Sequence, residues 1–167
     1  MPDFEFTVTF SVPNLEWNED YISNKIFGSG LNDALVLLGI RDVIGLEVFR
    51  SAPTAEEAIK SVTTDIRDVF SDAVILEVKP DLVSIADIAS LVGQSRQNLR
   101  KLVGFPPPTI TGSKPFWHLF EIIRWYKTKG KIPFPDNTAE TSKAAWIFNL
   151  QLEQKRLDSL GVTGTNS

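Results

Sequence analysis

Residues 4–12 alternate strictly between apolar and polar side chains, and no other feature of the sequence constrains the fold as much. The apolar positions are Phe4, Phe6, Val8, Phe10 and Val12, and the positions between them are Glu5, Thr7, Thr9 and Ser11. Successive side chains of a β-strand point to opposite faces of the sheet. The pattern therefore predicts a half-buried strand, which ends before Pro13.

The next 70 residues predict two helices and three further strands. Thr54 and Glu57 have the spacing of a capping box at the start of the second helix. The expected elements are a helix at 18–27, strands at 34–38 and 43–49, a helix at 55–70 and a strand at 73–78. Their order is the split βαβ pattern of ferredoxin-like domains. Two helices are expected on one face of an antiparallel sheet, and polar residues or a second copy of the chain on the other.

The charge of the chain is unevenly distributed along its length. Residues 1–80 contain 6 Lys/Arg and 14 Asp/Glu, whereas residues 81–131 contain 8 and 3. A basic segment inside an acidic chain indicates that one part contacts a polyanion and that another part has a different partner. The alternative is that the basic side chains only solvate a surface.

Several classes of site are excluded by composition. The absence of cysteine excludes disulfides, thiolate metal sites and cysteine nucleophiles, and a single histidine, His118, excludes sites that need two. We expect no catalytic residue, no metal and no cofactor, and therefore no enzyme. Apolar runs are too short for a membrane helix, and the first residues do not have the pattern of a secretory signal. A cytoplasmic protein is expected.

Residues 85–102 have the pattern of two short helices joined by a sharp turn. Gly93 suits the positive φ of the turn, and Ser95 is placed to cap the second helix. The residues expected between the helices are Ile88, Ala89, Val92, Leu99 and Leu102. The residues left on one exposed face are Arg96, Gln97, Arg100 and Lys101. Arginine can pair with guanine and glutamine with adenine in the major groove, although an ordinary helical hairpin with a polar face is the alternative.

The segment that follows predicts a small β-wing and a third helix. Phe105-Pro106-Pro107-Pro108 reads as an extended arm, Gly112-Ser113-Lys114 as a turn and Phe116-Trp117-His118 as an aromatic arm. Residues 82–127 together resemble the winged helix-turn-helix of excisionases and AlpA-type phage and prophage regulators, in the wider MerR superfamily. The resemblance implies contacts with specific double-stranded DNA at Ser95, Arg96, Gln97, Arg100 and Lys101, and at the wing residues Thr111, Ser113 and Lys114.

A basic cluster made of Lys127, Lys129 and Lys131 follows the third helix. These lysines could contact DNA phosphates, or they could belong to a solvated helix end. We expect Trp117 and Trp125 in the core, and His118 at the junction of wing and helix rather than on a phosphate.

The last part of the chain predicts a connector at 131–137 and a helix that Asn137 caps. The helix is expected to pack along a stripe made of Trp146, Leu150, Leu157 and Leu160, and residues 161–167 are expected to fray. The predicted units are an acidic ferredoxin-like domain at 1–80, a winged helix-turn-helix domain at 81–131, and a linker plus C-terminal helix at 132–167.

These features together predict a sequence-specific DNA-binding transcriptional regulator of phage, mobile-element or antitoxin type. We expect a homodimer, formed through the N-terminal sheet or the helix at 138–160, because one winged module contacts few base pairs. The acidic part would bind a protein partner or a small ligand. The alternatives are an architectural, excisionase-like factor that bends DNA, and an adaptor or ligand-sensing module that does not bind DNA.

Overall fold

The alternating segment forms the first strand, β1 (Asp3–Ser11), of the computed structural model, which describes residues 1–161. Its apolar side chains Phe4, Phe6, Val8 and Phe10 are buried, as predicted. The segment at 162–167, where fraying was expected, lies outside the described residues.

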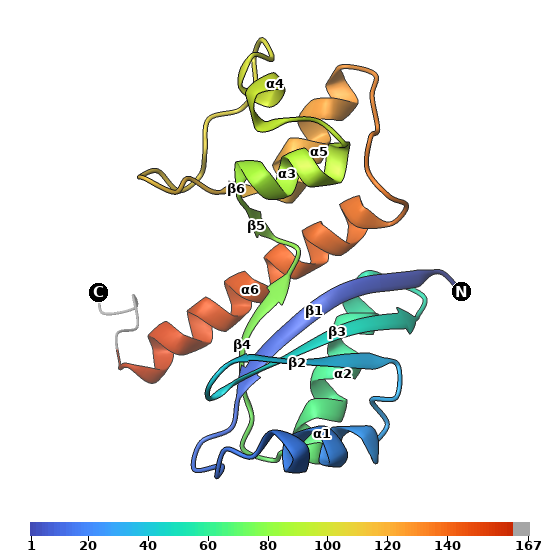
Figure 1. Ribbon diagram of the computed structural model, residues 1–167, viewed down its shortest axis with the longest axis vertical. Helices are drawn as coiled ribbons and strands as arrows, with labels where there is room; N and C mark the ends of the chain where they lie inside the picture. Colours follow the sequence, from blue (N-terminus) through green and yellow to red (C-terminus); the bar gives the residue numbers. More distant parts are fainter. Residues whose placement is uncertain (162–167) are drawn as a thin grey trace.

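Four strands form one antiparallel sheet in the order β2-β3-β1-β4, shown in Figure 1. The other elements of residues 1–80 are α1 (Glu19–Phe27), β2 (Ala34–Ile40), β3 (Val43–Ser51), α2 (Ala55–Val69) and β4 (Val74–Lys79). The later elements are β5 (Leu82–Val83), α3 (Ile85–Val92), α4 (Arg96–Arg100), β6 (Trp117–His118), α5 (Leu119–Thr128) and α6 (Thr138–Ser159). The predicted α+β class is confirmed. Within the described part of the chain, no helix combines the length and apolar character needed to cross a membrane.

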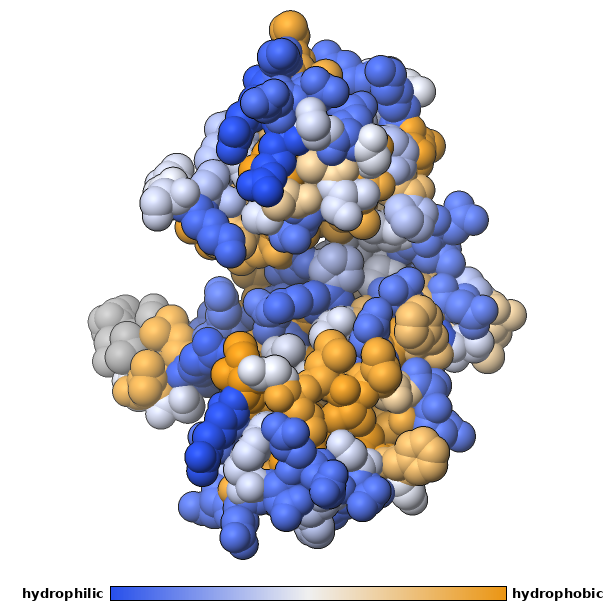
Figure 2. Space-filling view, in the orientation of Figure 1, coloured by the Kyte–Doolittle hydropathy of each residue, from blue (hydrophilic) through white to orange (hydrophobic). Residues whose placement is uncertain are grey.

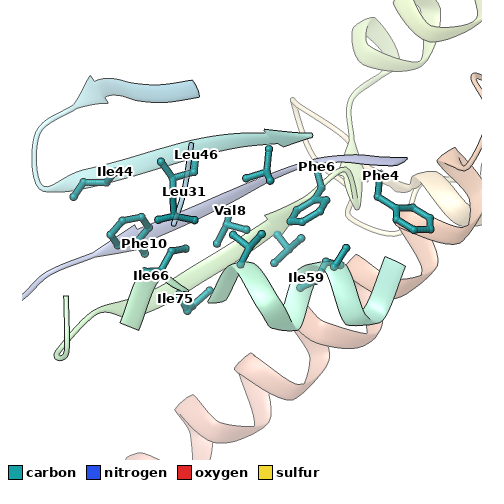
Figure 3. Close-up of a cluster of buried hydrophobic side chains, with 14 of the residues drawn as sticks. Phe4, Phe6, Val8, Phe10, Leu31, Ile44, Leu46, Ile59, Ile66 and Ile75 are labelled. Carbon is teal, nitrogen blue, oxygen red and sulfur yellow. The ribbon is translucent and has the colours of Figure 1, made fainter. Parts of the chain in front are cut away.

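The first hydrophobic core lies between the sheet and helices α1, α2 and α6. Figure 3 shows side chains of β1, such as Phe6 and Val8, directed toward Ile59 of α2. Asn18 caps α1 and Thr54 caps α2, each by accepting a hydrogen bond from a backbone N–H. The capping box expected at α2 is only half formed. The carboxylate of Glu57 does not accept from the N–H of Thr54; instead Glu140 of α6 accepts from the next N–H along the chain, that of Ala55 (3.0 Å).

Helix α6 packs with a different face from the one predicted. The prediction that a stripe of leucines packs after Trp146 was wrong, because Leu150, Leu157 and Leu160 are 54%, 44% and 73% exposed. The residues of α6 that pack in or against the first core are Ala144, Ala145, Phe148 and Leu152, and Thr141 and Ser142 are buried on the same helix. Small side chains at the centre of this face let α6 approach the sheet and α2 closely. Asn137 precedes the helix as predicted but does not cap it, since its amide donates to the backbone oxygen of Asp3 (3.1 Å).

Asn149 of α6 binds the edge of the sheet. Its Oδ1 accepts a hydrogen bond from the N–H of Val78 in β4, and its Nδ2 donates to the carbonyl of the same residue, both at 2.8 Å. These are the two bonds that a neighbouring strand would make at this position. The side-chain amide therefore occupies the place of a fifth strand beside β4.

The outward face of the sheet is not uniformly polar. Strand β1 presents Thr7 and Thr9 there, but Leu35, Leu37 and Phe49 of β2 and β3 are 58%, 42% and 55% exposed. Figure 2 shows the resulting apolar area over these two strands. We refer to Leu35, Leu37 and Phe49 as the outer apolar patch.

Candidate nucleic-acid interface

Local capping interactions position the two helices of the candidate site. Ser84 and Asp87 form a reciprocal capping box at the start of α3, and Gly93 ends the helix with φ of 69°, in the left-handed conformation that the turn requires. Ser95 then caps α4 by accepting from the N–H of Asn98 (3.1 Å). The predicted roles of Gly93 and Ser95 are therefore confirmed.

Helix α4 is held against α3 and α5 by buried aliphatic side chains. Leu99 is fully buried together with Ile88 of α3 and Leu119 of α5, in a second hydrophobic core. Val92 and Leu102 pack at its margin. The helix is shorter than predicted, because Lys101 already belongs to its C-cap and Leu102 follows in a turn.

The predicted base-contacting residues all lie on the surface. Arg96, Gln97, Arg100 and Lys101 are exposed, and so is Ser95. Within residues 1–161, none of the three cations is paired with a carboxylate, whereas Arg50, for example, binds both Asp33 and Asp65 at 2.7 Å. Their charges are therefore not neutralised within the described chain.

A short hairpin projects from the same part of the molecule, next to α3 in Figure 1. Ile110 and Phe116 exchange two backbone hydrogen bonds (3.1 and 3.0 Å), and the residues between them form an exposed tip that carries Thr111, Ser113 and Lys114. The Pro-rich arm before it is anchored because Nε1 of Trp117 donates to the carbonyl of Pro106 (2.9 Å). The hairpin is therefore closed by one pair of residues only, and it lies at the position of the predicted wing.

Lys127 lies in the last turn of α5, so the expected position of the basic cluster after the helix was wrong for this residue, and the structure separates it from Lys129 and Lys131. Lys129 and Lys131 line a shallow hollow with Gln94 and Leu102, so they lie beside the end of α4. Lys127 instead lines a hollow with Phe120 and Arg124. All three lysines are exposed, but only Lys129 and Lys131 are brought near the predicted recognition helix.

Two further cations surround Phe120 and were missed from the sequence. Arg124 lies 5.9 Å and the Nζ of Lys143 lies 5.8 Å from the centre of the Phe120 ring. Arg124 could have been found from its spacing to Lys127 on the same helix. Lys143 could not, because it reaches this position from α6.

Tyr126 lies between these surfaces and is buried against Phe134 and Trp125. Its hydroxyl is the one buried side-chain polar atom of residues 1–161 with no hydrogen-bond partner. Burial raises the pKa of Tyr126 above its usual value near 10.

His118 connects the candidate interface to the rest of the protein. The carboxylate of Asp81 accepts a hydrogen bond from Nδ1 of His118 (2.7 Å) and another from Nδ2 of Asn149 (2.9 Å). The imidazole also stacks on Trp146 of α6, with the ring centres 3.8 Å apart and an angle of 10° between the planes. The structure agrees with the prediction of a junction residue, but the partners of His118 come from outside the wing.

Comparison of the chain with protein-family models, with curated proteins and with solved structures finds no match. An interpretation of this surface therefore depends on the residues of the chain itself.

Proposed function

We propose that this chain is a sequence-specific regulator that binds double-stranded DNA in the cytoplasm through the segment at 81–131. One observation carries the proposal. The turn between α3 and α4 has the backbone conformation and the cap expected of a helix-turn-helix, and the exposed side chains that follow it are Arg96, Gln97, Arg100 and Lys101. A recognition helix presents its first residues to base edges in the major groove.

The finer description of the fold belongs to the same proposal. The antiparallel order β2-β3-β1-β4, with α1 and α2 on one face, supports a ferredoxin-like first domain. The hairpin at 110–116, between α4 and α5, supports a winged helix-turn-helix. Helix α6 joins the first core and stacks Trp146 on His118, which supports a fixed orientation of the two parts.

Lysine side chains would position the protein on the DNA without reading the sequence. Lys129 and Lys131 lie beside the end of α4, where a neighbouring phosphate of the same groove would pass. Lys114 at the hairpin tip would contact the backbone on the other side of the recognition helix. A homodimer on a palindromic site, with half-sites about 34 Å or a multiple of that apart, completes the proposal.

The test is selection of bound sequences from a random duplex pool at near-physiological salt, followed by binding measurements on the enriched motif. Arg96→Ala and Arg100→Ala should each cost about 1–3 kcal/mol and relax the preference at one base pair. Lys129→Ala should weaken binding to every sequence alike and reduce the salt slope by about 1. Lys60→Ala is the matched control, because Lys60 is exposed on α2 and paired with Glu56, so DNA binding should not change.

Each negative outcome has a distinct meaning. Weak, salt-sensitive binding without an enriched motif would replace the regulator with an architectural factor. Absence of binding to any duplex would refute the proposal and favour an adaptor. Unchanged affinity and specificity in both arginine variants would show that α4 is not the recognition helix.

A further inference from the structure

One edge of the sheet is covered by α6, and the other is not paired within the described chain. At the β4 edge, Asn149 binds both backbone groups of Val78, and Arg156 of α6 donates to the carbonyl of Leu76 (3.5 Å). At the other edge, β2 pairs only with β3 within the described chain. An unpaired edge strand is a template for another strand, and proteins usually protect such edges with charges, proline or a covering element.

Strand β2 carries no charge and no proline, and its pairing with β3 is regular from Ala34 to Leu37, with a register shift only between Leu37 and Ile40. Its sequence is Ala-Leu-Val-Leu-Leu-Gly-Ile, although residues 1–80 carry 14 Asp/Glu against 6 Lys/Arg. Leu35 and Leu37 point to the outward face, where they belong to the outer apolar patch. An apolar edge next to an apolar surface would cause aggregation if nothing covered it.

The register of the sheet shows which backbone groups are free. The N–H of Phe49 donates to the carbonyl of Asp33 (3.1 Å), so these opposed residues form a hydrogen-bonded pair. Such pairs alternate along an antiparallel ladder. Leu35, opposite Glu47, therefore bonds to β3, whereas Val36, opposite Leu46, directs its N–H and C=O away from β3.

We propose that β2 pairs with β2 of a second copy of this chain, antiparallel and with the two-fold axis at Val36. In this register Val36 of each copy would exchange both backbone hydrogen bonds with Val36 of the other. Leu35 would lie opposite the second copy's residue 37, and Ala34 opposite its residue 38. The N–H of Ala34 is already bonded to Leu31 (3.2 Å), but its carbonyl is available for the ladder.

Two observations favour a second copy over an unrelated strand: the charge of residues 1–80, and the closed dimer that pairing at β2 would give. The first 80 residues of two copies repel each other overall, and β2 is the edge at which they can meet without opposing like charges. Pairing at β2 also leaves β4 as the outer edge on both sides, and α6 covers each of these edges. The pair is then a closed two-fold dimer that cannot add further copies through its sheet.

The inference rests on the proposed function only for the use of the dimer, namely two recognition helices on one DNA site. Its test uses the full chain without DNA, by sedimentation velocity and light scattering. The unmodified chain should have twice the mass of the 18.6 kDa polypeptide. A chain that stays monomeric at high micromolar concentration would overturn the inference and the palindromic homodimer of the proposed function, but it would leave DNA binding through α4 standing.

Charge substitutions test the register. In L35E/L37E, like charges oppose each other twice across the two-fold, and the dimer dissociation constant should rise by about a hundredfold or more. In L35K/L37E, the same two positions carry opposite charges, so dimerisation should return. F49E is the matched control, because Phe49 is exposed on the same face but lies on β3; it should remain dimeric.

Circular dichroism and thermal unfolding check that each variant folds. We expect all of them to fold, because the substituted side chains lie on the outward face of the sheet. A dimer that persists in L35E/L37E would refute β2 as the dimer interface. A monomeric L35K/L37E would refute the proposed pairing of residue 35 with residue 37. A dimer with no affinity for any duplex would instead refute the proposed function alone.

Discussion

Replacing Asn149 by alanine tests how α6 stabilises the sheet. The change removes three hydrogen bonds: two to the backbone of Val78 and one to the carboxylate of Asp81. Val78 is fully buried and Asp81 is 5% exposed, so the groups left behind are poorly placed to find water.

The expected magnitude follows from these three groups. An unsatisfied buried polar group costs about 1–3 kcal/mol, and Asn149 is itself only half-buried while Asp81 keeps its bond from His118, so the low end applies to each. Asn149→Ala should therefore lower the free energy of unfolding by about 3 kcal/mol, which corresponds to a fall in Tm of about 6–12 °C for a protein of this size.

A second substitution separates hydrogen bonding from lost packing. Asn149→Asp preserves the volume and the acceptor for the N–H of Val78, but it places a carboxylate beside the carbonyl of Val78 and the carboxylate of Asp81. It should destabilise the protein more than alanine does. Gln151→Ala, an exposed position on the same helix, should have almost no effect.

The assay is urea unfolding followed by tryptophan fluorescence and circular dichroism. Trp146, one of four tryptophans, stacks on His118 close to the altered position, so part of the fluorescence change reports the junction. A loss below about 1 kcal/mol for Asn149→Ala, or an aspartate variant more stable than the alanine variant, would refute the reasoning.

Two other predictions concern single side chains of the second core and its turn. Tyr126→Phe should raise stability slightly near neutral pH, because it removes a buried hydroxyl that has no partner. The raised pKa of Tyr126 means that the unfolded chain loses this proton first, so above about pH 10 the unmodified protein should lose stability that the phenylalanine variant retains; parallel pH profiles would contradict this. Gly93→Ala should cost about 1–2 kcal/mol because φ is 69°, whereas Gly39→Ala, at a position with open space and no positive φ, should cost little; equal unfolding midpoints would refute the role of the turn.

Features that depend on nearby residues could be predicted from the sequence. The alternation in β1, the left-handed turn at Gly93 and the cap at Ser95 were all correct. Each follows from a side-chain period or from a bond that spans three residues, so a short window contains the information needed. For the same reason, the exposed face of α4 could be identified before its packing was known.

Features that join distant segments could not be predicted. Asn149 acts 71 residues from its partner Val78, and Glu140 completes the first turn of a helix 85 residues earlier. A polar residue on a helix has many possible partners, and only the tertiary arrangement selects one. The leucines of α6 were misassigned because apolar character was used to choose its packed face. The close contact instead uses Ala145 and Ser142, whose small size matters more than hydrophobicity.

The candidate interface shows the same division. Exposure of Arg96 and Arg100 follows from local helix geometry. The separation of Lys127 from Lys129 does not, because it depends on how the end of α5 lies between α4 and α6.

Helix α6 comes well after β4 in the chain, which has a consequence for the order of folding during synthesis. Strands β1 to β4 leave the ribosome well before Asn149, at a stage when β4 has no partner on its outer side and β2 has none either. The nascent sheet is therefore open at both edges until α6 emerges and docks against β4. Slow translation between residues 80 and 138 would prolong this exposure, and the yield of soluble protein should depend on how quickly α6 follows.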